Sequence, residues 1–576
     1  MLHCSRIALL AGALGALAAC RSAEAWRAGA DEEVYGILAE RRAELGATSA
    51  FSLEPPLQPL RAQLLAGAAA GQPQTLSLDL VGCLGVAAEN SRDWQDERER
   101  LFRAALDLTR QRWDFSVQEN GSASAFLAGT GGEAESQGFL SNFNLFKLLG
   151  IGTRITGDIG LDLLRDVGSG DGWDALSHLS LNITQPILRG FGAEIVMEPL
   201  TQAERDVLYQ ARRYERFRRT FAVDIAQRFF QVLERLDRLE NEEANYANLT
   251  RLRERNEALA EAGRLTDIQV DQARQDEFSA EDRLVAARRD LEAALDDLKF
   301  VLGLPIEVVL VLAEGGLRSL EAWPALAKDL PEERAVHIGL EQRLDHASVR
   351  DQAADAERGV RVAADALRMG LDLVASAGVD SPEGRPAALR ANDIGWDLTL
   401  GLDLPIDRIP ERNAYRSALI ALAASRRAVD ESSDRVTAEL RDALRRLDAA
   451  RASFRIQSGS VVLAERRVES AALNLDAGRA STRDVLEAQE SLLSAQNTHA
   501  AALTDTILAG LFLYRDMELL EVTDQGIEVL VLDETDSGGA GVRGAAADEA
   551  SSEANTDEAN TDEATPTRDP EPGERP

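Results

Sequence analysis

Two long stretches without proline constrain the fold of this chain more than any other feature. No proline occurs between Pro199 and Pro305, or again between Pro410 and Pro566. Proline interrupts helices, and both stretches carry apolar residues three and four positions apart, so long helices with a narrow apolar seam are predicted. The seam of the first stretch consists of Tyr214, Phe217, Phe221, Ile225, Phe229, Val232, Leu236 and Leu239. A break near Gly263 predicts a hairpin of two helices, each of roughly 50 residues and about 75 Å long.

The second half of the chain repeats the plan of the first. Its long helix has a heptad-like frame made by Leu419, Leu422, Val429, Val436, Leu440, Leu447 and Phe454. Two pairs of short segments occur at matching places: Ala262-Gly263-Arg264 with Ala477-Gly478-Arg479, and Gln185-Pro186-Ile187 with Leu404-Pro405-Ile406. Matching order and spacing indicate an internal duplication. Two unrelated coiled-coil hairpins are the alternative.

Segments in which apolar and polar residues alternate precede each long hairpin. A period of two predicts strands with one apolar face. The segments are Ile151 to Ile159 and Leu179 to Ile183 in the first half, and Leu371 to Ala375 and Ile394 to Leu404 in the second. Open sheet edges are not tolerated in hydrocarbon, and four strands are too few to close a barrel around a channel. The sequence therefore predicts a mainly α fold with a small β part to which several subunits contribute strands.

The first twenty residues form a targeting segment. One basic residue, Arg6, precedes an apolar run that is too short to span a bilayer. The run ends in Ala18-Ala19-Cys20, which resembles the bacterial lipoprotein box, with Cys20 as the acylated residue. An ordinary signal peptide, cut after Ala23 or Ala25, is the alternative. No later apolar run reaches the length of about 18 residues that a spanning helix needs, so none is predicted.

Charge and residue usage exclude several functional classes. The formal net charge is −35 and Lys and Arg do not cluster, so nucleic acid is not an expected partner. His337 and His346 are too far apart to share one helix face as a zinc pair would. The glycines near Gly131 lack the Lys that follows the glycines of a phosphate loop. We therefore expect no catalytic group, no metal and no cofactor, and the chain is not expected to be an enzyme.

The chain is expected to divide into six parts. From Asp533 onward it has few apolar residues and an acidic surplus, which predicts disorder. The parts are a lipoprotein-type signal peptide (1–19), an N-terminal adapter (20–72), a first repeat (73–305), a linker (306–331), a second repeat (332–532) and the disordered acidic tail (533–576). Within the repeats, further helices are expected over residues 75–112 and 332–366, and an extracellular loop is expected near Gly121 to Gly138.

Three segments carry a resemblance to a known family. They are Leu181 to Gly190, Ala477 to Gln489, and Arg343-Leu344-Asp345, which has Leu where Pro is usual. Together with the doubled order of helix, strand pair and long hairpin, they resemble the TolC-like outer-membrane efflux family over roughly residues 73 to 530. Each segment is weakly specific alone, and their order carries the resemblance.

The resemblance implies a homotrimer in the cell outer membrane, with its helical part in the periplasm. Three subunits with four strands each would form a 12-stranded β-barrel in outer-membrane lipid, continued by an α-helical tunnel. Gly263, Arg264, Gly478 and Arg479 would lie near the periplasmic tips, which in the family meet a periplasmic adaptor protein and an inner-membrane pump. The implied function is a passive export duct of a tripartite efflux or type I secretion system. A lipid-anchored periplasmic coiled-coil scaffold without a pore is the alternative, although it would have no use for the strands.

Asp484 and Glu487 match, by their spacing from Gly478, the acidic pair that rings the tunnel opening in the family. Residues three apart share one helix face, and threefold symmetry would bring six carboxylates together. Such a ring is expected to favour cations and repel anions. An exposed helix face in an acid-rich protein is the alternative. The corresponding position of the first repeat is Gln269, so a latch that needs a carboxylate there is not expected.

Overall fold

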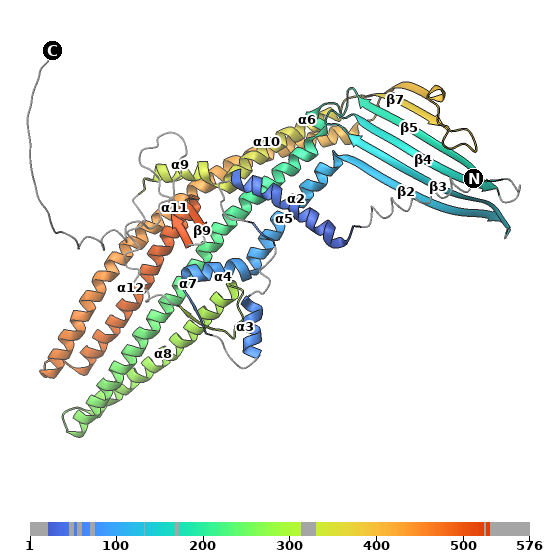
Figure 1. Cartoon of the computed structure of the whole chain (residues 1–576). Coiled ribbons are helices and arrows are strands. Elements are labelled where there is room, and N and C mark those ends of the chain that lie inside the picture. The colour runs from blue at the N-terminus through green and yellow to red at the C-terminus, as the bar shows by residue number, and fades with distance from the viewer. Residues whose placement is uncertain are drawn as a thin grey trace, which may run out of the picture.

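The computed structural model describes residues 21–44, 51–53, 60–69, 75–131, 133–166, 172–312, 330–523 and 526–529. Cys20, the signal peptide and the predicted acidic tail lie outside the described residues. The described part is elongated, with a β-sheet at one end and two helical hairpins projecting toward the other (Figure 1). It is mainly helical with a smaller sheet part, as predicted.

Two long hairpins dominate the molecule. They are formed by α7 (Glu198–Glu261) with α8 (Asp267–Val301), and by α11 (Ile409–Asp476) with α12 (Thr482–Asp516). The expectation of two helices of similar length is wrong, because α7 has 64 residues and α8 has 35. The longer helix of each hairpin continues past the end of its partner toward the sheet, where it packs against shorter helices (Figure 1). At 1.5 Å per residue, α7 is about 96 Å long.

Shorter helices pack along the long helices. They are α2 (Ala23–Glu44), α3 (Leu60–Ala69), α4 (Leu80–Asn90), α5 (Arg92–Asp114), α6 (Ala193–Val196), α9 (Glu332–Gln342) and α10 (Leu344–Asp365), with a 3-10 turn at Ala391–Asp393. Helices α3 and α4 lie beside the middle of α7 and the end of α8, and the others lie nearer the sheet (Figure 1). The helix expected over residues 332–366 is present, interrupted at Arg343. The helix expected from residue 75 starts later, because β1 (Thr75–Leu78) pairs with β6 (Val309–Leu312) in parallel. The Asp79 side chain then accepts a hydrogen bond from the Gly82 amide and caps α4.

The main hydrophobic core lies where the two halves of the chain meet. Phe229 and Phe230 of α7 are fully buried there, together with Leu298 of α8 and Leu503 of α12. A small antiparallel pair, β9 (Leu520–Thr523) with β10 (Gly526–Val529), packs against the same cluster. A second cluster joins α2 and α5 to α7, and a third joins α9 to α11 and α12. The seam predicted along α7 is therefore a core between helices of both halves.

A single antiparallel sheet of six strands has the order β2-β3-β4-β5-β7-β8. The strands are β2 (Val117–Thr130), β3 (Glu133–Leu148), β4 (Arg154–Asp166), β5 (Asp174–Pro186), β7 (Gly370–Asp380) and β8 (Gly395–Asp403). The first half of the chain thus supplies four strands, so the expectation of one pair per half is wrong. Gly121 to Gly138 was expected to be a loop, but these residues belong to β2, β3 and their turn at Gly131.

None of the helices in the described part of the chain combines the length and the apolar character needed to cross a bilayer.

Candidate functional site

The two hairpin tips, residues 259–270 and 474–485, have the same local structure. Gly263 has φ +70° and Gly478 has φ +68°, a left-handed conformation that favours glycine. The next amide turns back on the helix in both cases: Arg264 N donates to Leu259 O and Arg479 N donates to Asn474 O, each at 2.8 Å. Both arginine side chains are exposed, which suits them to contact another protein.

Each returning helix begins with a capping box. Asp484 Oδ2 accepts hydrogen bonds from Ser481 N at 2.7 Å and from Ser481 Oγ at 2.8 Å. These hydrogen bonds lower the pKa of Asp484, with a smaller contribution from nearby arginines. In the first repeat, Gln269 Oε1 accepts from Thr266 N at 3.2 Å. An amide oxygen caps the helix as a carboxylate does, which explains how the first repeat accommodates Gln where the second has Asp.

Glu487 lies one turn after Asp484, and both side chains are exposed. Its carboxylate is 2.7 Å from Arg467 Nη2 of the neighbouring helix α11. The two acids therefore share a helix face, as predicted, but they differ in their partners. Asp484 is hydrogen-bonded by Ser481 and has Arg483 and Arg467 nearby, whereas Glu487 forms a direct ion pair with Arg467.

The two hairpins contact each other close to their tips. Arg255 Nη2 of α7 lies 2.6 Å from Asp476 Oδ1 of α11. Beside this ion pair, Leu252 packs against Val485 and Leu486 of α12 in a buried cluster. This contact has no signal in the sequence, because Arg255 and Asp476 belong to different halves of the chain and no spacing links them.

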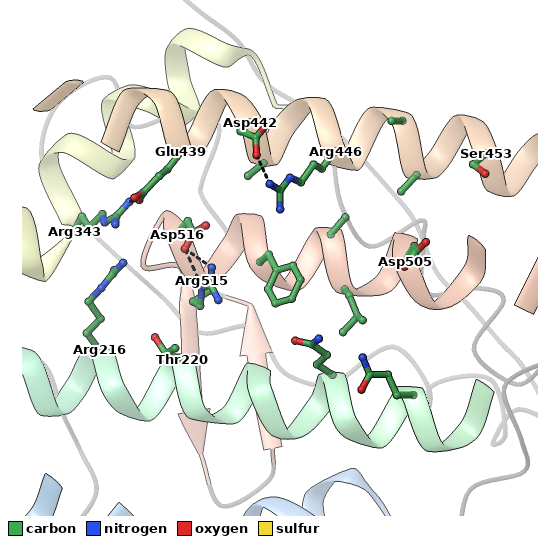
Figure 2. Close-up of a pocket in the computed structure, with 18 residues that line it drawn as sticks. Arg216, Thr220, Arg343, Glu439, Asp442, Arg446, Ser453, Asp505, Arg515 and Asp516 are labelled. Atoms are coloured by element: carbon green, nitrogen blue, oxygen red, sulfur yellow. Dashed lines mark hydrogen bonds and ion pairs between the residues drawn. The ribbon is translucent and has the colours of Figure 1, made fainter. Parts of the chain in front are cut away.

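An open groove of about 1150 Å³ lies between α7, α11 and α12. Figure 2 shows charged side chains from all three helices facing it, among them Arg216, Glu439 and Asp505. Several of these charges are paired within the groove, including Arg446 with Asp442 at 2.7 Å and Arg515 with Asp516 at 2.8 Å. In the described part of the chain, no group of three or more His, Cys, Asp or Glu side chains could hold a metal ion. The groove is lined by both polar and apolar side chains, the latter including Leu508 and Phe512.

The segment Arg343-Leu344-Asp345 joins α9 and α10 to the long helices. Buried Arg343 Nε lies 2.9 Å from Asp345 Oδ1, and its guanidinium also pairs with Glu439 of α11. Arg216 Nε of α7 lies 3.4 Å from Asp345 Oδ2. Leu344 occupies the first position of α10, where the backbone N–H has no partner within the helix, so Pro and Leu both fit. The departure from the usual Pro therefore leaves this junction intact.

The chain matches a model of a protein family described as outer membrane efflux protein. The match covers residues 171–304 and 337–515, more than half of the chain. The chain belongs to the outer membrane efflux protein family. A comparison with curated proteins gives no match.

Solved structures of outer-membrane channels share the fold of this outer membrane efflux protein. CusC is 16% identical with a TM-score of 0.57, and the match covers 77% of this chain and 93% of that structure. For the outer membrane protein VceC of Vibrio cholerae the values are 17%, 0.56, 76% and 95%. For the CmeC outer membrane channel of Campylobacter jejuni they are 16%, 0.55, 82% and 91%.

Family membership confirms four predictions made from the sequence. This efflux protein is located in the outer membrane, serves as an export channel, has its helical part in the periplasm and is not an enzyme. The pore-free scaffold is not favoured. The roles assigned to Gly263, Arg264, Gly478, Arg479, Asp484 and Glu487 remain predictions.

Proposed function

We propose that three copies of this chain assemble into the passive outer-membrane duct of a tripartite efflux or type I secretion system. The observation that carries this proposal is the position of exposed apolar side chains in the long hairpins. The helices contact one another in the order α8-α7-α12-α11, so α8 and α11 are the outer two. Among the described residues, large exposed apolar side chains are absent from α7 and α12 but present on both outer helices: Ile268, Phe278, Val285 and Phe300 on α8, and Ile409, Ile420, Ile456, Val462, Leu463 and Leu473 on α11.

These apolar rows suit contacts between neighbouring copies. A soluble monomer rarely leaves such rows uncovered, and a closed ring would bury α8 of one copy against α11 of the next. The sheet is open at two edges as well, β2 and β8. Both the helical part and the sheet can therefore form a closed ring only together with other copies of the chain. A barrel in outer-membrane lipid would follow, continued by a helical tunnel. The 12-stranded barrel expected from the resemblance uses four strands of each copy, β4, β5, β7 and β8.

The hairpin tips are the proposed contact with a periplasmic adaptor protein and an inner-membrane pump. Gly263 and Gly478 shape the turns, and Arg264 and Arg479 point their charges to solvent. Energy would come from the pump. The proposed division of the chain into two repeats, 73–305 and 332–532, is supported by the returning helices, which have 35 residues each and begin four residues after the tip glycine.

Asp484 and Glu487 form the proposed acidic ring at the tunnel opening. The double substitution Asp484→Gln with Glu487→Gln removes the charge and keeps an amide oxygen at the cap, as Gln269 does in the first repeat. We expect lower preference for cations and weaker block by multivalent cations in planar-bilayer recordings. The pair Glu24→Gln with Glu40→Gln on α2 removes the same charge at a distance and serves as the control. Unchanged selectivity in the tip variant would remove the two acids from the conduction path.

Cys20 is the proposed lipid anchor, with residues 1–19 removed as a signal peptide. Acyl chains contribute roughly 0.8 kcal/mol for each buried CH₂ and would add to the hold of the barrel. Cys20→Ala is expected to lose metabolic labelling by palmitate. Labelling that persists in this variant would contradict the assignment.

The native mass of the protein, extracted in detergent from outer membranes, tests the assembly. We expect a particle near three times the 62.4 kDa of the chain, less the signal peptide. Recovery as a monomer or dimer would contradict the duct and would favour the scaffold.

A further inference from the structure

The hairpin β2–β3 has no counterpart among the described residues of the second half of the chain. The pairs β4–β5 and β7–β8 each precede a long helical hairpin, whereas β2–β3 is added between α5 and β4. Like β4, it precedes the segments that match the family, the first of which begins at residue 171. It is nevertheless part of the sheet, because β3 pairs with β4 from Ser136↔Asp166 to Leu148↔Arg154. At its base, Lys147 Nζ donates to Phe115 O at 2.6 Å and ties β3 to the end of α5.

The added hairpin continues the apolar face of the other four strands. Directly paired residues of neighbouring strands point to the same face, so the register traces each face across the sheet. One face carries Ala123, Ala125 and Leu127 of β2, Phe139, Phe143 and Leu145 of β3, Ile159 and Leu161 of β4, Leu179 and Leu181 of β5, Leu371 and Leu373 of β7, and Leu398, Leu400 and Leu402 of β8.

The opposite face is mainly polar over the same six strands. It carries Asn120, Ser122 and Ser124 of β2, Asn142 and Asn144 of β3, Thr156 and Asp158 of β4, Ser180 and Asn182 of β5, Asp372 and Ser376 of β7, and Asp397 and Thr399 of β8. Apolar residues outside and polar residues inside are the pattern of a membrane barrel wall. β2 and β3 follow that pattern over most of their length. The exceptions include Glu119 and Ser141 on the apolar face, and Phe126, Leu140 and Phe146 on the polar face.

The two edge strands of the sheet, β2 and β8, run in directions that allow antiparallel pairing between copies. Every neighbouring pair in the order β2-β3-β4-β5-β7-β8 is antiparallel, so β2 and β8 at the two ends also run in opposite directions. In hydrocarbon, each backbone group left unpaired at an edge costs several kcal/mol. An edge of this kind in a membrane wall requires a partner strand, and β8 of a second copy presents one in the right direction.

We propose that β2 of one copy pairs with β8 of the next, so that the trimeric duct is closed by 18 strands rather than 12. The inference rests on the proposed trimeric duct and deepens it by assigning the surface through which the copies join in the membrane. Barrel diameter grows roughly linearly with strand number, so this wall is about 1.5 times as wide as a 12-stranded one.

A 12-stranded barrel would require β4 of one copy to pair with β8 of the next, and the geometry of the sheet disfavours that pairing. β4 would have to leave β3 and give up the ladder from Ser136↔Asp166 to Leu148↔Arg154. The displaced hairpin would then place Phe139, Phe143 and Leu145 in the aqueous lumen, or leave its edge unpaired in lipid. Neither placement suits a hairpin with one apolar and one polar face.

Cysteine pairs across the proposed joint test the inference. Leu400→Cys in β8 is combined in turn with Gly121→Cys, Ala123→Cys or Ala125→Cys in β2, all on the apolar face. Within one copy these strands are at opposite edges of the sheet, so a disulfide can form only between copies. After mild oxidation of outer membranes, we expect covalent dimers and trimers that disappear on reduction. Three partner positions are used because the register between copies is not fixed beforehand.

A matched series of cysteine pairs tests the alternative joint, between β8 of one copy and β4 of the next. Leu400→Cys combined with Gly157→Cys, Ile159→Cys or Leu161→Cys in β4 reports a joint between β8 and β4, and we expect no covalent trimer from it. The unsubstituted chain, whose Cys83 is buried, is the blank. Cross-linking in the β4 series, or in neither series while the native mass is that of a trimer, would overturn the 18-stranded joint and leave the duct in place.

Two measurements separate failure of this inference from failure of the proposed function. A native mass below that of a trimer would remove the duct itself and the joint with it. Electron cryomicroscopy of the unsubstituted trimer counts the strands without any variant, so the test does not depend on whether the cysteine variants fold. Eighteen strands support the joint, and twelve contradict it.

Discussion

The glycine at the tip of the second hairpin, Gly478, is predicted to control the stability of the turn between α11 and α12. Gly478 has φ +68°, and a Cβ placed there would meet no atom within 4 Å. Gly478→Ala therefore introduces no clash and removes no contact. Its entire effect on stability comes from forcing an L-residue into the left-handed region, which costs about 1–2 kcal/mol.

The expected size of the effect follows from that strain. A loss of about 1–2 kcal/mol corresponds to an approximately 5–30-fold change in a local opening equilibrium. The amide that reports it is Arg479 N, which donates to Asn474 O at 2.8 Å and closes the turn. We expect hydrogen exchange of this amide to become faster by that factor. Gly478→Asn, which tolerates the left-handed region better, is expected to show a smaller change.

The same helix supplies a control of opposite sign. Gly459 lies inside α11, and a Cβ there would also meet no atom within 4 Å. Alanine is a better helix former than glycine, so Gly459→Ala is expected to raise the local free energy of helix opening by about 1 kcal/mol. Hydrogen exchange of nearby amides should slow accordingly. If both alanine substitutions change exchange in the same direction, or if Gly478→Ala leaves exchange of the Arg479 amide unchanged, backbone strain at Gly478 does not control the stability of the turn.

Three further predictions concern buried contacts. The Glu518 side chain is 3% exposed, and its carboxylate lies 2.8 Å from Arg219 Nη1. Glu518→Gln is therefore expected to lower the free energy of unfolding in detergent by about 3 kcal/mol, and an unchanged denaturation midpoint would contradict this. Burial alone would raise the pKa of Asp345, but Arg216 and Arg343 outweigh it and lower the pKa below 3.8. The stabilising contribution of Asp345 is therefore present above pH 3.8 and lost as the pH falls through the lowered pKa, so Asp345→Asn should unfold more easily than the unsubstituted protein at pH 7 and equally easily in strong acid. Leu486→Ala removes a buried side chain between the hairpins at an expected cost of about 2–5 kcal/mol, seen as faster hydrogen exchange in both tips.

The long helices and their turns were predictable because their determinants are local. The absence of proline, the spacing of Phe221, Ile225 and Phe229, and the glycines at the turns each act within a few residues of their own position. The unequal lengths of α7 and α8 follow from local signals as well. Pro199, Gly263 and Pro305 divide the proline-free stretch unequally, and Gly303, with φ +71°, ends α8 just before Pro305.

The added hairpin shows the limit of reading strands from sequence. Between Asn120 and Ala128 the alternation is present, but small residues carry it: Ser122 and Ser124 on one face, Ala123 and Ala125 on the other. Such residues have weak strand preference, and the ladder to β4 stabilises them from a distance. For the tips, Ser481 and Asp484 could have been recognised as a capping box. The ion pair of Arg255 with Asp476 had no sequence pattern to reveal it.

The matched tips have a consequence for anything that docks on them. Both returning helices start four residues after the tip glycine and have equal length, so the two tips of one chain offer quasi-equivalent binding sites, and a ring of three chains would offer six. A protein that recognises the backbone shape of one tip would bind the other in the same orientation. The two tips differ in charge at three corresponding positions: Asp267 matches Thr482, Ile268 matches Arg483 and Gln269 matches Asp484. A docked protein can therefore distinguish alternate tips by charge although their backbones match.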